Sequence, residues 1–473
     1  MTLTKPDITT SLTGKWKSYP AYKDSGVEWL GEIPVHWEVK RLKYATGINQ
    51  EVLPESTDPD YMLKYVDISN VDSYGAILDA QEMSFENAPS RARRIVRHGD
   101  TIISTVRTYL RAIGLIAHPP ENLIVSTGFA VLRPISEMNA KFLWRLVQSD
   151  EFVNTVVTYS EGVGYPAINP GRLGNLFTWL PPLPEQCAIA TFLDRETTKI
   201  NTLIAKKERL VELLQEKRAA LISQAVTKGL DPTVPMKDSG IEWLGEIPAH
   251  WEVKRLKFVA KFFGGGTPSK DILDYWSGDI PWVSPKDMKA EIVYDAEDHI
   301  TEYAIEHSAT RLIQTGAILI VVRSGILRHS IPVAINVRPV ALNQDMKALV
   351  AEPFLRAGYL ASLIRGHEGA LLVEWRKEGA TVESIEFELL ANTPCPIPPL
   401  FEQQAIANYL DHETAKIDAL ISRIREGIEK LKEYNTALIS AAVTGKIDVR
   451  GNDDRAGARY GEATETDSRS SDL

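Results

Sequence analysis

The chain contains two copies of one pattern, and this repeat constrains its fold more than any other feature. Residues 23–44 read KDSGVEWLGEIPVHWEVKRLKY, and residues 237–258 read KDSGIEWLGEIPAHWEVKRLKF. The two segments differ at three of 22 positions, and each change is conservative. A second pair begins at Pro181 and Pro398 with PPLPEQ and PPLFEQ. Such a repeat predicts one scaffold that is built twice.

The repeated segments enclose two blocks that share little sequence, at residues 45–180 and 259–397. The first repeated pair is offset by 214 residues and the second by 217, so three extra residues enter the second copy between 258 and 316. A length of 473 residues allows two to four domains, at roughly 100–200 residues each. A common frame with unlike blocks favours recognition of two different targets over two copies of one active site.

The segments that close the copies, residues 181–229 and 398–446, predict long helices, because apolar residues recur at spacings of four and three. In the first helix the expected interface residues are Ile189, Leu193, Ile200, Leu203, Leu210, Leu214 and Leu221. In the second they are Ile406, Leu410, Ile417, Leu420, Ile424, Leu431 and Leu438. The first helix leads within ten residues into the second lead-in, so paired helices would run antiparallel. The alternative is two amphipathic helices that pack on separate cores.

Composition limits the class of protein. The chain is 44% hydrophobic and 25% charged, as in globular proteins, and its net charge of −10 argues against non-specific coating of nucleic acid. The two cysteines, Cys187 and Cys395, are too few for a disulfide framework or a cysteine zinc site. Apolar runs such as residues 317–322 are too short to cross a bilayer, and the N-terminal residues lack a signal-peptide core. We expect a cytoplasmic protein without membrane contact.

The two blocks are expected to be mixed α/β. Strand-like runs lie at residues 63–68, 101–106, 129–132, 280–283, 317–322 and 348–350, and helical ones at 140–155 and 356–365. Residues 85–115 contain six arginines against Glu86 and Asp100. Arginine suits phosphates and the guanine edge in the major groove, although a solvated charged face remains the alternative. The glycine run at residues 264–266 could offer amides to a phosphate, and a plain turn is an equal alternative.

This layout resembles the specificity subunit of type I restriction–modification enzymes. The resemblance covers residues 16–448 and includes the duplicated PPLxEQ-type segments, each followed by a long helix. The segments GGGTPS, YW and GDIPWVS of the second block, and YVDISNV of the first, are similar to signatures of target recognition domains. The first block lacks GGTPS, which leaves its DNA-facing loops harder to place.

The resemblance implies two target recognition domains separated by an antiparallel coiled coil, each domain reading one half of a bipartite site on double-stranded DNA. It also implies docking of two modification subunits, which carry S-adenosylmethionine and methylate adenine N6, and of restriction subunits that use ATP. This chain would then be non-catalytic and bind no cofactor or metal, with Mg expected on the partners. The expected domains are a flexible segment 1–22, recognition domain 23–180, helix 181–229, recognition domain 237–397, helix 398–446 and a disordered tail 449–473.

Candidate DNA contacts are charged or polar residues in or beside predicted loops. They are Arg91, Arg93, Arg94, Arg107 and Arg111 in the first block, and Lys270, Lys286, Arg323, Ser324 and Arg328 in the second. Each could instead be an ordinary surface residue. Trp29, Trp37, Trp243 and Trp251 recur in both lead-ins, so we expect them to pack rather than to read unlike sequences.

Two other classes of function are open. A Mg-dependent endonuclease is one, because Asp24, Glu38 and Lys40 form a loose nuclease pattern that recurs at Asp238, Glu252 and Lys254. A scaffold that binds no DNA is the other. A methyltransferase is disfavoured because the nearest match to its Asn/Asp-Pro-Pro-aromatic motif is Asn169-Pro170-Gly171, and no GxxxxGKS/T phosphate loop occurs.

Overall fold

The structure is a computed structural model that describes residues 16–72, 75–377, 379 and 381–450. Of the two end segments expected to be flexible or disordered, residues 1–15 and 451–473 lie outside the described part. The remainder of those segments is packed, since Tyr19 and Val449 are both buried and Lys17 forms a β-bridge with Asp448. The folded region therefore extends a few residues beyond both expected boundaries.

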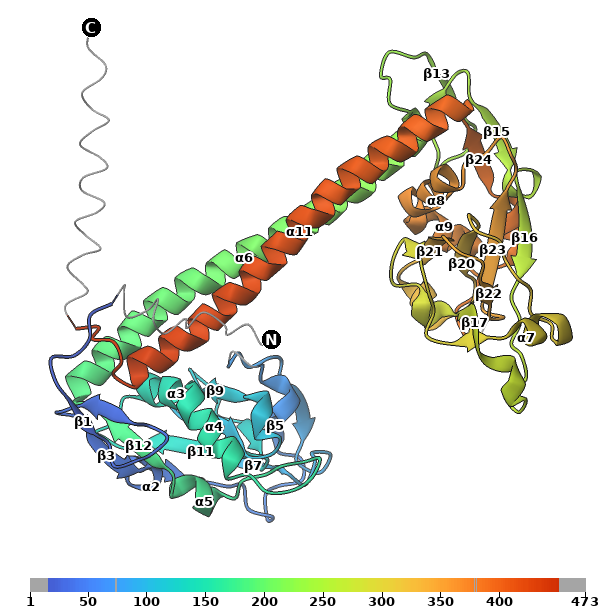
Figure 1. The fold of residues 1–473 in the computed structure, drawn as a ribbon. Helices are drawn as coiled ribbons and strands as arrows, with labels where there is room; N and C mark the ends of the chain where they lie inside the picture. The colour runs from blue at the N-terminus through green and yellow to red at the C-terminus, as the bar shows by residue number, and fades with distance from the viewer. Residues whose placement is uncertain (1–15, 73–74, 378, 380, 451–473) are drawn as a thin grey trace, which may run out of the picture. The chain divides into compact units, whose positions relative to one another are not determined.

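The chain divides into two compact units. Unit 1 comprises residues 1–206 and 426–473, and unit 2 comprises residues 207–425. Each unit combines one repeated lead-in, one divergent block and part of each long helix (Figure 1). The expected mixed α/β fold with an internal two-domain repeat is confirmed.

In the part of unit 1 that the structure describes, the strands form four small sheets. The lead-in forms two antiparallel pairs, β1 with β2 and β3 with β12, and the block forms two four-stranded sheets in the orders β6-β5-β10-β7 and β4-β11-β8-β9. The strands are β1 (Tyr22–Asp24), β2 (Glu32–Pro34), β3 (Glu38–Arg41), β4 (Thr46–Ile48), β5 (Met62–Val66), β6 (Gln81–Ser84), β7 (Ala92–Ile95), β8 (Thr101–Ser104), β9 (Ile113–Leu115), β10 (Leu123–Ser126), β11 (Phe129–Pro134) and β12 (Phe177–Leu180). The short helices are α2 (Leu42–Ala45), η1 (Ile68–Asn70), η2 (Thr108–Leu110), α3 (Ala140–Gln148), α4 (Asp150–Thr158) and α5 (Pro170–Gly174).

Unit 2 repeats this plan. Its lead-in pairs are β13 with β14 and β15 with β24, and its block sheets have the orders β16-β23-β20-β21-β18 and β19-β17-β22. The strands are β13 (Met236–Asp238), β14 (Glu246–Pro248), β15 (Glu252–Arg255), β16 (Ala260–Gly264), β17 (Trp276–Val283), β18 (Ile292–Val293), β19 (His299–Ile300), β20 (Ile318–Val321), β21 (Val333–Asn336), β22 (Ala341–Leu342), β23 (Met346–Ala351) and β24 (Pro394–Ile397). The short helices are η3 (Leu256–Phe258), η4 (Leu273–Tyr275), η5 (Pro285–Asp287), α7 (Glu302–His307), η6 (Gly325–Arg328), α8 (Ala357–Gly366), α9 (Glu368–Trp375) and α10 (Phe387–Asn392).

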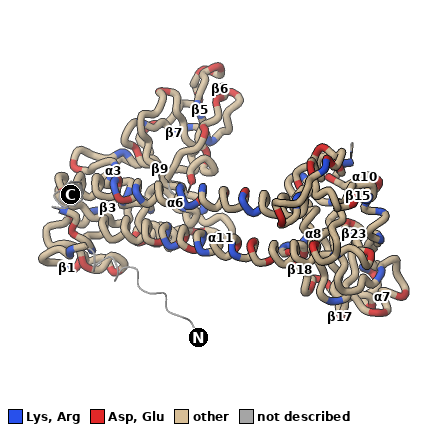
Figure 2. Tube along the Cα trace, turned by 90° about the horizontal axis from the view of Figure 1, so that it is seen from above, with Lys and Arg blue, Asp and Glu red and all other residues tan. Residues whose placement is uncertain are grey.

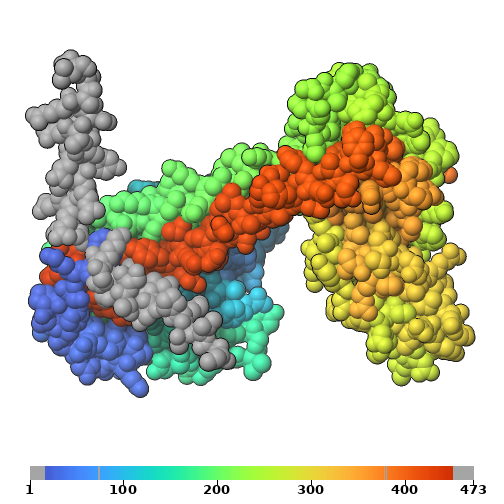
Figure 3. Space-filling model, turned by 45° about the horizontal axis from the view of Figure 1, so that its top comes forward, coloured from blue at the N-terminus to red at the C-terminus, as the bar shows by residue number. Residues whose placement is uncertain are grey.

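The long helices are α6 (Leu183–Lys228) and α11 (Leu400–Val443), close to the expected bounds. Within unit 2, Arg218 of α6 forms an ion pair with Asp418 of α11 at 3.1 Å. Within unit 1, Asn201 lines a cavity together with Asn435. The neighbour of the earlier α6 residue is thus the later α11 residue, so the helices run antiparallel. They lie side by side in Figures 1 and 3.

The apolar interface residues between the helices differ from the predicted ones at alternate positions of the series. Leu203, Leu210 and Leu420 were expected at the interface, but their exposed fractions are 44%, 44% and 45%. The neighbouring residues Ile204, Val211, Ile421 and Ile428 are buried in the seam instead. Of the other predicted residues, Ile189, Leu193, Ile200, Ile406, Leu410, Ile417, Ile424 and Leu438 are buried, and Leu214, Leu221 and Leu431 are half-buried. The buried series thus runs from Ile417 to Ile421 and then to Ile424, a step of four residues followed by one of three. The prediction had the same two steps in the opposite order.

The glutamine of the repeated Glu-Gln pair makes the same contacts in both units. Gln186 accepts a hydrogen bond from Asn139 N (2.8 Å) and donates to Glu137 O (2.9 Å). Gln403 does the same with Arg356 N (2.7 Å) and Phe354 O (3.0 Å). In each unit this side-chain amide fixes the block to the first turn of a long helix.

The lead-in tryptophans pack as expected. Trp37 and Trp251 are fully buried, and their indole nitrogens donate to Glu185 (3.0 Å) and Glu402 (2.9 Å) respectively. Trp29 and Trp243 are half-buried and make ring contacts with Trp179 and His367. These side chains serve the scaffold shared by both copies.

Candidate nucleic-acid interface

The first group of predicted contacts in unit 1 lies on and beside β7. Arg91 is exposed and donates to Asp67 (2.6 Å) and to the hydroxyl of Tyr65 (3.2 Å), which holds its guanidinium beside η1. Hydrogen bonding to Tyr65 and the charge of Asp67 raise the pKa of Arg91. Arg93 lies over the ring of Phe85, 4.4 Å from its centroid. Arg91 is exposed and held in one direction, and the half-buried Arg93 is stacked on a ring. Both arrangements suit contact with a base or phosphate.

Arg94 is less suited to contact a ligand. Its side chain is half-buried, and burial lowers its pKa. Its Nε is buried and has no hydrogen-bond partner within the described residues. A DNA contact by Arg94 therefore stays a prediction. Its half-buried position favours a structural role.

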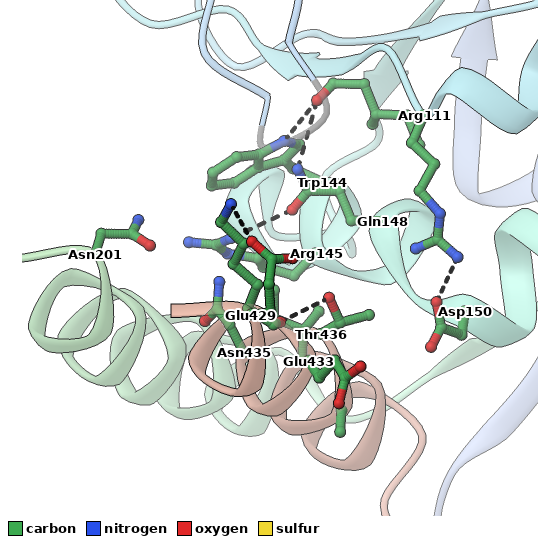
Figure 4. A pocket seen from close by; sticks show the side chains of 14 residues that line it. Arg111, Trp144, Arg145, Gln148, Asp150, Asn201, Glu429, Glu433, Asn435 and Thr436 are labelled. Atoms are coloured by element: carbon green, nitrogen blue, oxygen red, sulfur yellow. Dashed lines mark hydrogen bonds and ion pairs between the residues drawn. The ribbon is translucent and has the colours of Figure 1, made fainter. Parts of the chain in front are cut away.

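Arg107 and Arg111 flank η2 but face different surroundings. Arg107 has φ +50°, donates its backbone N–H to Pro166 O (2.8 Å), and lies 4.2 Å from the ring centroid of the exposed Tyr165. Arg111 has φ +57° and pairs with Asp150 at 2.5 Å. It lines a cavity of about 560 Å³ with residues of α3 and α11, including Trp144 and Asn435 (Figure 4). The structure thus places Arg111 at the junction with the helices, apart from the loop that carries Tyr165.

In unit 2, Arg323 and Arg328 meet in one cluster at the end of β20. Arg323 lies 3.2 Å from Asp345, and Arg328 lies 3.5 Å from Glu383. Arg376, which the sequence reasoning did not single out, shares the same Glu383 oxygen at 3.2 Å. The three arginines are 59%, 66% and 66% exposed, so the cluster presents cations held by two carboxylates.

The other predicted residues of unit 2 have distinct roles. Ser324 caps η6: its Oγ accepts from Ile326 N, and its backbone N–H donates to Glu383 O (3.0 Å). Lys286 of η5 is exposed and pairs with Asp298 (2.9 Å) and Glu297 (3.2 Å). Lys270 is exposed after the glycine run. Ser324 is therefore part of the loop framework, whereas both lysines are accessible.

Two of the three amides in the glycine run of unit 2 are already bonded within the fold. Gly265 N donates to Met346 O (3.3 Å), and Gly266 N donates to Leu342 O (2.8 Å). A Cβ built on Gly265 would lie 1.9 Å from Asn343 O, so a side chain at this position would collide with the neighbouring backbone. Close approach to the sheet, rather than phosphate binding, explains this glycine.

The two units place equivalent loops on equivalent strands, with different side chains. β8 and β20 are related by the offset of 217 residues, and each leads into a 3-10 helix, η2 or η6. Each loop also forms a β-bridge with a later segment, Val106 with Ala167 and Arg323 with Ser384. Sequence reasoning missed Tyr165, Arg376 and Glu383 because they stand in these later segments. No local pattern in the sequence links these residues to the loops that they contact.

Carboxylates accompany most of the exposed cations of the candidate interface. Asp67, Asp298, Asp345 and Glu383 each pair with at least one predicted or neighbouring basic residue. Figure 2 shows Lys and Arg interspersed with Asp and Glu in both units. An acidic chain can therefore still present directed cationic side chains.

The acids of the first nuclease pattern have partners within the fold. Asp24 accepts from Gly26 N in a turn, and Glu38 pairs with Lys40 at 3.0 Å. No group of three or more His, Cys, Asp or Glu side chains among the residues that the structure describes could hold a metal ion. In the same part of the chain, no helix combines the length and apolar character needed to span a membrane.

Comparison with known proteins points in one direction. A family model described as the type I restriction modification DNA specificity domain matches residues 34–213 and again residues 248–430. The EcoR124I/EcoR124II specificity subunit from Escherichia coli is 38% identical over 201 residues, which cover 42% of this chain and 46% of that protein. The match thus spans less than half of that relative. A putative type I restriction enzyme MjaX specificity subunit from Methanocaldococcus jannaschii is 25% identical over 438 residues, which cover 89% of this chain and 96% of that protein.

Solved structures share the fold. One chain, from a study of complex assembly and conformational transition of the type I R-M system, has a TM-score of 0.68 and 26% identity, and the match covers 87% of this chain and 98% of that one. The HsdS subunit from Thermoanaerobacter tengcongensis has a TM-score of 0.50 and 23% identity, with coverage of 88% and 98%. The second likeness concerns the fold alone.

Proposed function

The chain belongs to the family of type I restriction-modification DNA specificity domains, and we propose that its two blocks read the two unlike halves of one bipartite DNA site. The observation that carries this proposal is the pairing of one duplicated frame with two different loop surfaces. Equivalent positions hold Val106 and Arg323, or Arg107 and Ser324. Identical surfaces would suit a symmetric site, whereas unlike surfaces suit an asymmetric one.

Base reading by these loops follows from arginine chemistry. A guanidinium can donate two parallel hydrogen bonds to guanine O6 and N7 in the major groove. Arg91, Arg93 and Arg107 in unit 1, and Arg323, Arg328 and Arg376 in unit 2, are the side chains we propose for this role. Lys270 and Lys286 are proposed phosphate contacts, because lysine acts as a compact point charge.

The repeated parts of the chain are proposed to dock two copies of a modification subunit. Exposed apolar residues recur in matched pairs on the frame: Tyr44 and Phe258, Leu183 and Leu400, Leu203 and Leu420. Two like patches suit two copies of one partner, in contrast to the unlike loops. In this proposal the partners hold S-adenosylmethionine, restriction subunits hold ATP and Mg, and this chain itself is non-catalytic.

The spacer between the half-sites is proposed to depend on α6 and α11. α6 is the continuous helix through which the chain passes from unit 1 into unit 2. A change in helix length alters rotation as well as rise, about 100° and 1.5 Å per residue. The number of unspecified bases should therefore respond to insertions or deletions in the helices.

A block exchange tests the proposal. Residues 45–180 are replaced by the corresponding block of another family member, and the chain is co-expressed with a modification subunit. We expect the methylated site to change in one half only, while the matched exchange of residues 259–397 changes the other half. A change of both halves by either exchange would contradict the assignment of one half-site to each block.

A further inference from the structure

The arginine cluster of unit 2 is held in an unusual way, with three cations on two partly buried carboxylates. Arg328 and Arg376 both contact the Oε1 atom of Glu383, at 3.5 and 3.2 Å. Arg323 contacts Asp345 at 3.2 Å. The side chains of Glu383 and Asp345 are only 18% and 21% exposed, whereas the arginines are largely exposed. The carboxylates thus form the base of the cluster and the guanidinium groups its surface.

Backbone contacts fix the position of both carboxylates. Glu383 O accepts from Ser324 N at 3.0 Å, and Asp345 O accepts from Val322 N at 2.8 Å. Asp345 directly precedes β23, whose first residue Met346 pairs with Val321 of β20. Asp345 therefore lies at the start of a paired strand, and Glu383 is tied by its backbone to the loop of η6. Either side chain can be changed without removing these backbone bonds.

Each arginine is held through a part of its donor set. Arg376 donates a hydrogen bond from one terminal nitrogen to Glu383 at 3.2 Å, whereas Arg323 and Arg328 face their carboxylates through Nε as ion pairs. A guanidinium has five N–H donors in a planar fork. A contact at one side places the guanidinium beside its carboxylate and leaves other donors available to a ligand.

We infer that Glu383 and Asp345 are specificity-determining residues, which orient the arginines of unit 2 toward bases and oppose their contact with phosphates. This inference rests on the proposed DNA-reading function. On a cognate site the carboxylate keeps its arginine in the reading orientation, so less rotamer freedom is lost on binding. On any other duplex the carboxylate contributes only its negative charge, which repels the phosphate backbone.

The carboxylate is thus expected to strengthen binding to the cognate site and to weaken binding to other DNA. A purely structural or a purely repulsive carboxylate would affect both kinds of DNA in the same direction. Removal of the charge by Glu383→Gln should strengthen binding to non-cognate DNA and weaken binding to the cognate site. A purely structural glutamate would weaken both. A purely repulsive one would strengthen both.

The test uses the full chain in complex with its modification subunit. Two duplex probes of equal length are compared by fluorescence anisotropy at one salt concentration: a site selected from a randomised pool by the wild-type complex, and the same duplex with the half read by unit 2 scrambled. For Glu383→Gln we expect the selected site to bind about three- to tenfold more weakly and the scrambled duplex about two- to fivefold more tightly. Asp345→Asn, which acts on Arg323, should show the same opposite shifts.

The control is Glu352→Gln. Glu352 pairs with Lys261 at 3.6 Å, is 30% exposed, and lies at the other end of β23 from Asp345. It should shift neither probe. Shifts of one sign on both probes, or no shift in either cluster variant, would overturn the inference. Failure of the wild-type complex to distinguish the two probes would instead overturn the proposed function.

Discussion

The two copies of the frame anchor their lead-ins with one glutamate each, and the two anchors should differ in strength. The Glu185 side chain is 5% exposed and accepts from Tyr19 OH (2.6 Å), Trp37 Nε1 (3.0 Å) and His36 Nε2 (2.7 Å). Burial and the hydrogen bond to Glu185 raise the pKa of Tyr19, so its hydroxyl stays a donor.

In unit 2 the same anchor is weaker. Glu402 is 25% exposed, and its partners among the described residues are Trp251 Nε1 (2.9 Å) and His250 Nε2 (2.7 Å). The position that corresponds to Tyr19 is Thr233, whose hydroxyl donates to Asp231 instead. The Glu185 anchor therefore has one more buried hydrogen bond and a more deeply buried carboxylate, and it also forms an ion pair with Arg450 at 3.9 Å.

We predict that Glu185→Ala lowers the free energy of opening of its lead-in by about 3–5 kcal/mol, because it leaves buried donors without an acceptor. Glu402→Ala should cost about 1–2 kcal/mol, since water can reach the donors that it leaves. Hydrogen exchange of peptides from residues 22–41 and 236–255 measures both values in the intact chain. The unaltered lead-in of each variant is the internal control. Equal losses, or a larger loss for Glu402→Ala, would refute the reasoning.

Three further predictions concern the helices and unit 2. Ile204→Asp should destabilise unit 1 by about 3 kcal/mol or more, because it buries a charge. Leu203→Asp should change stability by less than about 0.5 kcal/mol, as measured by urea denaturation. A larger loss for Leu203→Asp would instead support the interface predicted from the sequence. Burial lowers the pKa of His367 in the folded state. As the pH falls, the imidazole is therefore protonated in the unfolded state before it is protonated in the folded state, and stability should decrease below about pH 6.5. His367→Gln should lose less stability than the wild type between pH 7.5 and pH 5.5, and equal losses would contradict this origin. Deletion of seven residues from α6 should change the spacer or abolish binding, and methylation of an unchanged site would argue against a role of the helix in spacing.

The repeated frame was predictable because its evidence is local and duplicated. Near-identical segments and the spacing of apolar residues in the tails indicate two lead-ins and two long helices without knowledge of tertiary contacts. The seam was harder, because Leu203 and Ile204 are adjacent apolar residues and either can continue a helical stripe. Burial in the structure selects Ile204, and the offset of 217 residues carries the same shift to Leu420 and Ile421.

Local capping also decided one boundary that periodicity missed. Residues 140–155 were expected as one helix, but Ser149 ends α3 and begins α4. Its φ of −61° and ψ of 149° are extended, and its Oγ accepts from Phe152 N. Serine at an N-cap supplies the acceptor that the first turn needs.

The candidate site was only partly predictable. Charged residues near strand ends could be named, but their partners lie far along the chain: Arg328 meets Glu383, and Arg107 meets Tyr165 across a loop. Such pairs depend on how the later segment returns to β8 or β20, which no local pattern encodes. For the same reason Arg111 was grouped with Arg107, although its side chain faces the cavity beside α3 and α11.

The most direct test of the central claim is methylome sequencing of a host that expresses this chain together with its modification subunit. The account predicts methylated adenines within one motif that has two unlike specified segments, separated by a fixed number of unspecified bases. A continuous or fully palindromic motif would contradict it, as would methylation that does not change when this chain is omitted.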